Sequence, residues 1–427
     1  MSKRQVAVVV LTAVIVSSSM CSAVLGSDQL PWNVERIRAY CVWDNDNAKA
    51  RNTTAWDIDQ TPTNYTGQNI RIAILDTGMD YSVQNGTAYP HPDLAQNVAG
   101  FWGMTGFYYD PSGGQVIFFH DPVNDPTFIQ DTDGHGTEVA GVIAAAINGI
   151  GVIGVAPNVT IYSLKINPKP RSDPYWEWEE EEEVAAAIHC AVYSLEVNII
   201  SISMDWTPSN SDLQSNCTDA ANMGVLIFVA AGNDNQAIWQ YPALYSNGTS
   251  TYTVSAVGAI DQNDTRSSYS NYGPKLIFVA PGDNVTTTGL AGTYTNVSGT
   301  SFSAPAAAAV AALICSSKVQ PDYSNHWDWL SVWHKMKDTV YNLGTSGWNN
   351  YTGWGLVNAW MSNQRPLGDV NNDHKVDGKD ITILTLAWAS YPGSSNWDPR
   401  ADINIDKKVD GKDLTIVVLH YGDHTDP

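Results

Sequence analysis

The feature that most constrains the fold is a regular alternation of apolar runs with helical stretches across residues 67–361. Residues 70–75 form a mostly apolar run, typical of a buried strand, that ends at Asp76. Similar runs occur at 160–166, 198–204, 225–230 and 253–257, and helical stretches accompany them at 137–147, 181–193, 218–223 and 304–315. This alternation predicts an α/β fold, in which helices cover both faces of a parallel sheet.

The C-terminal region contains an internal repeat, which predicts a second, smaller domain. Residues 369–380 recur as residues 402–413, and each copy runs into an apolar segment, 381–388 or 414–421. The tripeptide Gln364-Arg365-Pro366 interrupts the preceding pattern. A repeat this close marks a separate unit. We therefore expect the α/β domain over residues 27–365 and a small α-helical domain over residues 366–427.

The first residues indicate export. Lys3 and Arg4 precede an apolar run, residues 6–16, and small residues follow as far as Ala23. This order is typical of a secretory signal peptide, here residues 1–26, and the apolar run is too short to span a bilayer stably. We prefer a cleaved signal to an uncleaved anchor and expect no membrane span in the rest of the chain.

An excess of acidic residues narrows the range of partners. The chain has 44 acidic and 22 basic residues, a formal net charge of −22. Nucleic-acid binding requires clustered Lys and Arg, so the composition argues against a nucleic-acid partner. A solvated acidic surface suits a secreted, extracellular protein. Ten Asn-x-Ser/Thr sequons, among them Asn64, Asn158, Asn247 and Asn296, suit a glycoprotein.

Four cysteines remain once the signal is removed: Cys41, Cys190, Cys217 and Cys315. In an oxidising compartment an even number favours disulfides. The alternative is that they are buried as small apolar side chains. The sequence alone does not give a pairing.

Three glycine-flanked motifs carry the residue types of nucleophilic catalysis. Asp76 ends an expected strand in Asp76-Thr77-Gly78, and His135 and Ser301 each open an expected helix, in Gly134-His135-Gly136 and Gly299-Thr300-Ser301. A serine hydroxyl is a weak nucleophile until an imidazole can take its proton, and a carboxylate must orient that imidazole. Glycines allow sharp turns and close approach of a substrate. Together the motifs predict a catalytic triad.

These motifs, in the order Asp, His, Ser, resemble those of the subtilisin family, and the resemblance extends over residues 28–361. It implies a secreted serine endopeptidase that hydrolyses peptide bonds of proteins or peptides through an acyl-enzyme. It also implies that Asn233, in Ala231-Gly232-Asn233, stabilises the oxyanion. The segment 30–34 resembles the start of a mature enzyme, so we expect no prosegment. The rival hypothesis is a catalytically silent scaffold or binding protein that keeps the fold.

The same resemblance indicates how a substrate would be held. The backbone of Ser203, Met204 and Asp205, with that around residues 176–178, would pair with the substrate as an added strand. Asp205 stands where the family usually has glycine, and Asp234 adds a second carboxylate near the primary pocket. The hypothesis that follows is a preference for basic substrates. Glu177 and residues 179–183 form an acidic run with two interpretations. It lies near the outer edge of the substrate-binding cleft, or it is simply a solvated helix N-terminus.

The resemblance further implies a structural calcium ion in the α/β domain. The matching ligands are Asp28 or Gln29, then Asp93 and Asn148, which give the oxygen shell that Ca²⁺ prefers. Main-chain carbonyls would come from Ala146, Ile150 and Val152. An insertion at residues 81–89 lengthens the segment between Asp76 and Asp93.

Each copy of the C-terminal repeat has the ligand order of an EF-hand calcium loop. Oxygen side chains fall at loop positions one, three, five, nine and twelve: Asp369, Asn371, Asp373, Asp377 and Asp380, then Asp402, Asn404, Asp406, Asp410 and Asp413. Lys375 and Lys408 would contribute carbonyl oxygens. The paired loops, each followed by one helix, resemble dockerin modules, whereas a merely acidic linker would not repeat its period.

A dockerin-like module implies a role in tethering. The resemblance implies that the module folds on Ca²⁺ and binds a cohesin-bearing scaffold protein, which would associate the chain with a cell surface. In such modules the recognition residues lie near the end of each loop, here Gly378-Lys379 and Gly411-Lys412.

Overall fold

The structure is a computed structural model of the chain. It describes residues 28–39, 66–84, 87–103, 130–166, 180–206, 209–246, 254–316, 329–344, 347–359, 368–370, 375–391, 394–396, 398, 401, 403 and 408–423. The expected signal peptide, Cys41 and the segment 176–178 lie outside these residues.

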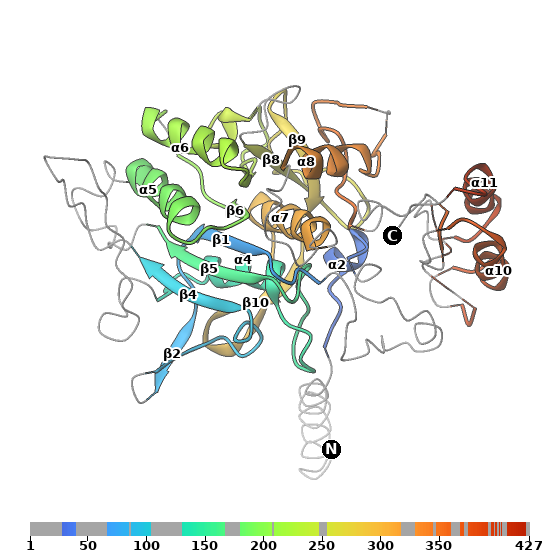
Figure 1. Cartoon of the computed structure of the whole chain (residues 1–427), viewed down its shortest axis with the longest axis horizontal. Helices are drawn as coiled ribbons and strands as arrows, with labels where there is room; N and C mark the ends of the chain where they lie inside the picture. Colours follow the sequence, from blue (N-terminus) through green and yellow to red (C-terminus); the bar gives the residue numbers. More distant parts are fainter. Residues whose placement is uncertain are drawn as a thin grey trace, which may run out of the picture.

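A seven-stranded parallel sheet forms the centre of the larger domain (Figure 1). Its strands, in spatial order, are β4 (Val98–Gly103), β5 (Thr160–Lys165), β1 (Arg71–Asp76), β6 (Ile199–Ile202), β7 (Leu226–Ala230), β8 (Ser255–Ile260) and β9 (Leu276–Pro281). Strands β6 to β9 are buried throughout, as expected where helices cover both faces. The predicted α/β fold is confirmed, and β4 and β9 are strands that the sequence analysis did not include.

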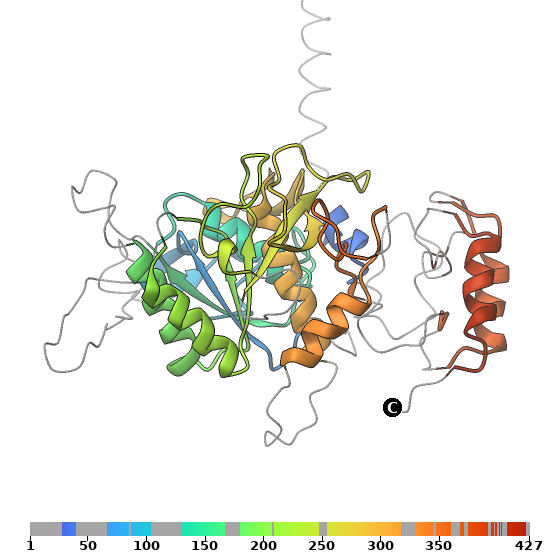
Figure 2. The ribbon, with the colours of Figure 1, turned by 90° about the horizontal axis from the view of Figure 1, so that it is seen from above.

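Helices pack on both faces of this sheet (Figure 2). On one face, α4 (His135–Ala144) packs against α7 (Thr300–Ser316), and α8 (Trp329–Asp338) packs against α7. On the other face, α5 (Glu180–Tyr193) and α6 (Ser211–Asn222) lie side by side. The short helix α2 (Trp32–Arg36) contacts β9.

Helix α6 begins earlier than the expected helix at residues 218–223. The side chain of Asn210 accepts hydrogen bonds from the N–H groups of Asp212 (2.8 Å) and Leu213 (3.1 Å) and so caps the helix. The first turns carry mostly exposed polar residues, with Leu213 buried. Apolar periodicity was therefore a poor guide to this helix start.

Two hairpins and two short turns of 3-10 helix complete the larger domain. Strand β2 (Tyr81–Gln84) pairs with β3 (Thr87–Pro90), and this hairpin occupies the predicted insertion. Strand β10 (Val285–Thr288) pairs with β11 (Tyr294–Val297) and packs on α4. The 3-10 turns are η3 (Ala243–Tyr245) and η4 (Leu290–Gly292).

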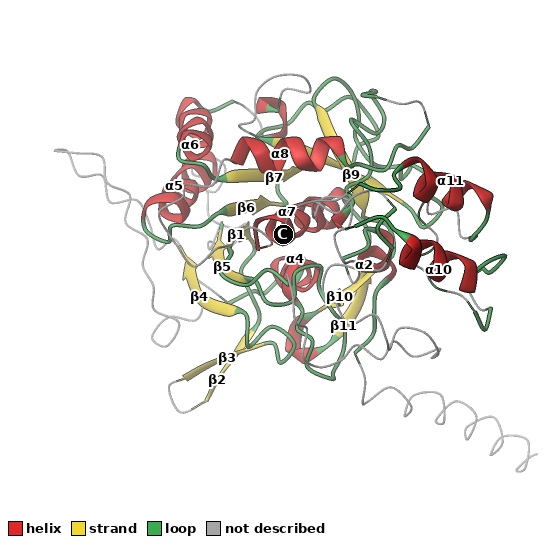
Figure 3. Ribbon diagram, turned by 45° about the vertical axis from the view of Figure 1, so that its right-hand side comes forward, coloured by secondary structure: helices red, strands yellow, loops and turns green. Residues whose placement is uncertain are grey.

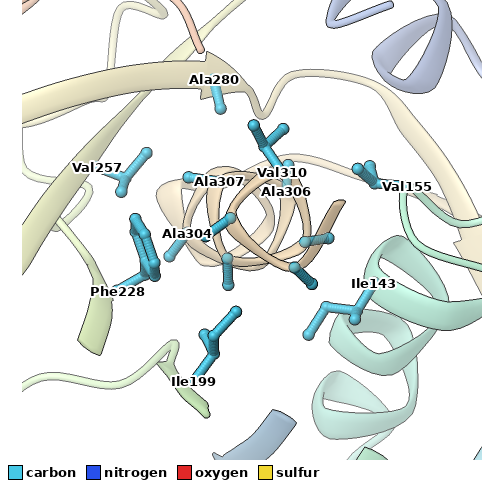
Figure 4. Packing of buried hydrophobic residues seen from close by; sticks show 14 of the residues in the cluster. Ile143, Val155, Ile199, Phe228, Val257, Ala280, Ala304, Ala306, Ala307 and Val310 are labelled. Carbon is cyan, nitrogen blue, oxygen red and sulfur yellow. The ribbon is translucent and has the colours of Figure 1, made fainter. Parts of the chain in front are cut away.

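Helix α7 lies in the middle of the core (Figure 4). All of its residues are buried, and seven of them are alanines. In Figure 4 the helix is surrounded by Ile143, Ile199, Phe228, Val257 and Ala280, which belong to α4 and to β6 to β9. The small side chains let α7 approach its neighbours closely.

In the repeat region, α10 (Gly378–Leu386) and α11 (Gly411–Leu419) lie side by side (Figure 3). Each helix follows one copy of the repeat, which agrees with the expected single helix per loop. In the described part of the chain, no helix has the length and apolar character needed to cross a membrane.

The described cysteines are buried thiols, which favours the second of the two alternatives considered above. Cys190 and Cys217 form no disulfide, and Cys315 is likewise buried in α7. Burial raises the pKa of Cys190 to about 11 and that of Cys217 to about 12. These thiols are therefore poorly ionised and act as small apolar side chains.

Candidate functional site

The candidate residues meet at the carboxyl ends of three neighbouring strands. Asp76 is the last residue of β1, Ser203 directly follows β6, and Asn233 comes shortly after β7. The chain places β4 and β5 on one side of β1 and β6 to β9 on the other, so the strand order reverses between β1 and β6. Ligand sites in open parallel sheets occur at such a reversal, outside the carboxyl ends.

Asp76 and His135 form a short hydrogen bond. The Nδ1 atom of His135 lies 2.7 Å from Oδ1 of Asp76, whose side chain is almost wholly buried. Burial alone would lower the pKa of His135, but the Asp76 carboxylate, with smaller contributions from Glu138 and Asp133, raises the pKa above its ordinary value. The carboxylate therefore orients the imidazole and stabilises its charged form.

Two glycines allow the loops that carry this pair to come together. Gly134 caps α4 with a φ of 107°, a conformation that side chains disfavour. A Cβ atom at Gly136 would overlap the carbonyl oxygen of Gly78. The glycines of the Asp76 and His135 motifs thus let the two backbone segments approach each other closely, as the sequence predicted.

One buried carboxylate, Asp131, ties these two loops together. Its Oδ1 accepts hydrogen bonds from the Thr77 hydroxyl (3.0 Å) and from the N–H groups of Asp133 (3.1 Å) and Gly134 (2.8 Å). Its Oδ2 accepts from the N–H (2.9 Å) and the hydroxyl (2.6 Å) of Thr137. Sequence reasoning missed this residue, although an Asp just before a helix start is a signal for capping.

Ser301 lies at the start of α7, where hydrogen bonds join it to the end of β6. The hydroxyl of Ser203 donates to the Ser301 carbonyl (2.7 Å), and the hydroxyl of Ser301 donates to the Ser203 carbonyl (3.3 Å). The Ser301 carbonyl can accept this bond because Pro305, four residues on, has no N–H to donate. The Phe302 ring lies beside that of His135, with centroids 5.5 Å apart.

The side chain of Asn233 has a fixed orientation. Its Oδ1 accepts from the N–H (2.9 Å) and the hydroxyl (3.0 Å) of Thr300, and the first of these groups can only donate. The Nδ2 atom therefore carries the remaining donors. Because Thr300 directly precedes Ser301, these donors lie beside the serine.

Asp205 and Asp234 follow the carboxyl ends of the neighbouring strands β6 and β7. Oδ1 of Asp205 accepts from Nε2 of Gln240 (3.0 Å), and Oδ2 of Asp234 accepts from Nε1 of Trp239 (3.0 Å). Burial raises the pKa of Asp205, and the charge of Asp234 raises it further. The remaining residue of the predicted substrate-binding set, Met204, is partly buried and packs against the core.

The predicted calcium ligands of the larger domain are also brought together in part. Burial raises the pKa of Asp28, and the nearby backbone of residues 148–150 lowers it in part. The backbone of Gln29 pairs with Gly151 and Ile153. Burial raises the pKa of Asp93 to about 7, and Asp28 adds to this effect. Oδ1 of Asp28 is buried without a hydrogen-bond partner.

Asn148 fits the predicted set of calcium ligands less well than Asp28 and Asp93 do. It turns its amide nitrogen toward Oδ1 of Asp93 (3.1 Å), while its oxygen accepts from Ile150 N–H (3.0 Å). The second oxygen of Asp93 accepts from Val152 N–H (3.0 Å). The two carboxylates therefore fit a cation, but the Asn148 oxygen is directed elsewhere.

In the repeat region, the first and last positions of the first loop meet. Asp369 and Asp380 are both fully buried, and Val370 N–H donates to Oδ1 of Asp380 (2.7 Å). In the second loop, Ile403 N–H donates to Oδ1 of Asp413 (2.7 Å) in the same way. Both loops therefore have the closure that a calcium loop requires.

Position nine of each loop has a role that the sequence analysis did not assign. Asp377 and Asp410 are the N-caps of α10 and α11, accepting from Lys379 N–H (2.7 Å) and Lys412 N–H (2.8 Å) in capping boxes. Of the other predicted ligands, Asn371, Asp373, Asp402, Asn404 and Asp406 lie outside the described residues. Among the residues that are described, no three His, Cys, Asp or Glu side chains form a metal cluster.

Comparison with known proteins assigns both domains. A sequence model of the subtilase family matches residues 67–355, and one of the dockerin type I domain matches residues 367–419. Subtilisin Savinase of Lederbergia lenta is 32% identical over 333 residues, covering 78% of this chain and 98% of the relative. An alkaline protease of Alkalihalobacillus alcalophilus is 32% identical over 333 residues, covering 78% and 70%.

A thermostable alkaline protease of Halalkalibacterium halodurans is 35% identical over 298 residues, covering 70% of this chain and 68% of the relative. The match to the subtilase family model, residues 67–355, includes all the strands of the parallel sheet and the three glycine-flanked motifs. The chain therefore belongs to the subtilase family of serine peptidases and carries a dockerin type I domain at its C-terminal end.

Proposed function

We propose that this protein is a secreted serine endopeptidase in which Asp76, His135 and Ser301 form the catalytic triad. The observation that supports this most directly is the 2.7 Å hydrogen bond from His135 to the buried Asp76. Because this bond uses Nδ1 of His135, Nε2 remains available to accept the proton of the nucleophile. Ser301 opens α7 in contact with the end of β6, the neighbour of β1 in the sheet.

In the proposed reaction, the Ser301 hydroxyl turns from the Ser203 carbonyl and gives its proton to Nε2 of His135. The Ser301 oxygen then attacks the peptide carbonyl, and His135 passes the proton to the leaving amine. A water molecule, deprotonated in turn by His135, hydrolyses the acyl-enzyme. Asp76 stays ionised throughout and stabilises the imidazolium.

The oxyanion of the tetrahedral intermediate would be stabilised by two donors. One is Nδ2 of Asn233, whose oxygen is occupied by Thr300. The other is the N–H of Ser301, which lies in the first turn of α7, where N–H groups have no partner within the helix. The backbone of residues 203–205 is the proposed site for pairing with an extended substrate.

We further propose calcium sites in both domains. In the larger domain, Asp28 and Asp93 would bind one ion, and Asn148 would complete the shell after rotation of its amide. In the repeats, Asp369 with Asp380 and the equivalent residues of the second loop would each hold one ion. The bound ions would neutralise buried carboxylates and so stabilise the fold.

The proposed role of the dockerin type I domain is attachment to a cohesin-bearing scaffold outside the cell, after removal of the signal peptide 1–26. The two helices begin with the same capping box, and Lys379 and Lys412 take equivalent places in it. Either copy could therefore present the same surface, which allows two docking orientations.

Labelling with a fluorophosphonate probe tests the peptidase function directly. We expect the purified protein to be labelled at Ser301 and to hydrolyse an unstructured protein substrate. Ser301→Ala should remove both activities while the far-UV circular dichroism spectrum stays unchanged. If the natural protein is neither labelled nor active, the rival hypothesis of a catalytically silent scaffold protein is favoured.

A further inference from the structure

We propose that Asp205 and Asp234 select a Lys or Arg side chain on the substrate residue whose carbonyl is attacked. This inference rests on the proposed peptidase function and adds a substrate class to it. It concerns the part of the site where the acyl half of the substrate lies.

Asp205 and Asp234 both stand close in the chain to residues of the proposed active site. Asp205 comes two residues after Ser203, whose carbonyl accepts the Ser301 hydroxyl at 3.3 Å. Asp234 directly follows Asn233, the proposed oxyanion donor. The strands that lead to them, β6 and β7, are neighbours in the sheet.

The electrostatics of the site separate this pair from the leaving-group side. The charges that raise the pKa of His135 come from Asp76, Glu138 and Asp133. Asp205 instead feels the charge of Asp234. Because His135 protonates the leaving amine in the proposed reaction, the leaving half lies beside His135, whereas the backbone of residues 203–205, which includes Asp205, is the proposed site for the acyl half.

The hydrogen bonds around the pair leave acceptors without donors. Gln240 gives its Nε2 to Asp205 (3.0 Å), and Trp239 gives its Nε1 to Asp234 (3.0 Å), so one oxygen of each carboxylate is already bonded. Oε1 of Gln240 is buried and has no hydrogen-bond partner. The second oxygens of the two carboxylates, Asp205 Oδ2 and Asp234 Oδ1, are therefore left for a ligand, whereas Gln240 Oε1 has almost no exposed surface.

A Lys ammonium or an Arg guanidinium would match these acceptors, because both groups carry only donors and a positive charge. Among the described residues, no ion pair neutralises Asp205 or Asp234. A cationic side chain would relieve the repulsion between the two carboxylates as it binds. An apolar side chain would leave this repulsion in place and would remove water from the two carboxylates without offering them a donor.

The backbone beside the pair is closely packed. Gly232 has a φ of 96°, and a Cβ atom built on it would overlap Nδ2 of Asn271 and lie 3.6 Å from Oδ2 of Asp205, so only glycine fits here. The overall charge of −22 would in addition attract basic peptides over a longer range. This attraction weakens as the ionic strength rises.

The test uses the full chain and a series of peptides that differ only in the residue before the scissile bond, with Lys, Arg, Gln, Leu or Phe. We expect kcat/KM for Lys and Arg to exceed that for Leu by about tenfold or more, the range for hydrogen bonds to a charged partner. In Asp205→Asn and in Asp234→Asn, the ratio of kcat/KM for Lys to that for Leu should fall by about tenfold. The ratio should also fall with added salt.

The matched control is Asp219→Asn, which makes the same change of charge on the exposed side of α6 and should keep the Lys-to-Leu ratio. Fluorophosphonate labelling of every variant separates the two hypotheses. If the natural protein is not labelled, the peptidase function itself fails. If it is labelled but prefers large apolar residues, and Asp205→Asn and Asp234→Asn keep that preference, the inference about basic substrates is overturned.

Discussion

The orientation of the Asn233 amide follows from its neighbour. Thr300 N–H can only donate, so it holds the amide oxygen and leaves the amide nitrogen for the site. The contact to an oxyanion forms as the carbonyl becomes tetrahedral, so it acts on the transition state more than on substrate binding. Asn233→Ala should therefore lower kcat by a factor on the order of 10²–10³, a magnitude known for such a donor in a subtilisin, with little change in KM.

Steady-state kinetics on one peptide substrate would measure both constants. Asn222→Ala, at an exposed position at the end of α6, is a suitable control and should behave like the natural protein. An effect of Asn233→Ala on KM alone would show that the amide binds substrate rather than the oxyanion.

The pH dependence of activity reports on His135. It must be neutral to accept the Ser301 proton, and its pKa is raised above the ordinary value by Asp76, Glu138 and Asp133. Activity should therefore rise with pH through a pKa higher than about 6.5. Glu138→Gln removes one of these negative charges, so the rising limb of the kcat/KM profile should move to lower pH.

A profile of kcat/KM against pH, taken at low and at high salt, measures this shift. Asp219→Asn again serves as the control, because its carboxylate is exposed on α6 and is not among the groups that act on His135. If the rising part of the kcat/KM profile stays at the same pH in Glu138→Gln, then the Glu138 charge does not raise the pKa of His135.

At the scale of single residues, the sequence predicted the residues of the motifs but not the residues whose hydrogen bonds hold the surrounding loops in place. Asp76, His135 and Ser301 stand in short motifs whose chemistry can be read directly, whereas the role predicted for Asn233 comes from the family resemblance. Asp131 and the caps Asp377 and Asp410 could not be assigned from spacing, because their roles depend on which backbone N–H groups the fold brings to them.

Helix α7 is anchored to the sheet by a bond that its own sequence makes necessary. Pro305 leaves the Ser301 carbonyl without a helical donor, and the Ser203 hydroxyl takes that place at 2.7 Å. Ser203→Ala would leave this buried carbonyl unpaired. We expect the free energy of unfolding to fall by about 1–3 kcal/mol.

Urea unfolding monitored by tryptophan fluorescence, in the Ser301→Ala background to prevent self-digestion, would measure this loss. Ser215→Ala, on the exposed side of α6, controls for the removal of a hydroxyl. Equal stability of the two variants would mean that the carbonyl finds another donor.

The elements themselves were predictable where apolar periodicity is strong. The cores of β1, β5, β6, β7 and β8 coincide with the expected runs, since buried parallel strands are apolar on both faces. The start of α6 was not predictable in this way because its first turns are polar and exposed and depend on the Asn210 cap. The strand β9 was missed even though it is entirely buried.

On the scale of the whole molecule, calcium should act on the two domains separately. In the repeats, buried carboxylates such as Asp369 and Asp380 lie close together. Helices α10 and α11 are too short to be stable alone. Removal of Ca²⁺ by EDTA should therefore release the amide protons of both helices to fast hydrogen exchange, while those of β6 and β7 stay protected.

Hydrogen exchange with mass spectrometry on the full chain would follow both domains in one experiment. Calorimetric titration should find two calcium ions in the repeats and one in the larger domain. Asp93→Asn should remove only the ion of the larger domain. Helices that stay protected in EDTA, or repeats that bind a number of ions other than two, would contradict the proposed loops.

The division into a signal peptide, a domain over residues 27–365 and a domain over residues 366–427 remains a prediction at its boundaries. The family matches at 67–355 and 367–419 fall within the two domains. Composition and repeats indicate where units lie, whereas exact boundaries depend on packing in segments that the described residues do not include.

The alanine-rich helix α7 limits which substitutions this chain can accept. The seven alanines of α7 are buried on every side, and the same helix carries Ser301 in its first turn. A larger side chain at Ala307 or Ala311 would push the helix away from its neighbours, and Ser301, the proposed nucleophile, would move with it. In a library of α7 variants, we expect many soluble, folded proteins that fluorophosphonates no longer label, so selection on activity would conserve this interior more strictly than selection on folding.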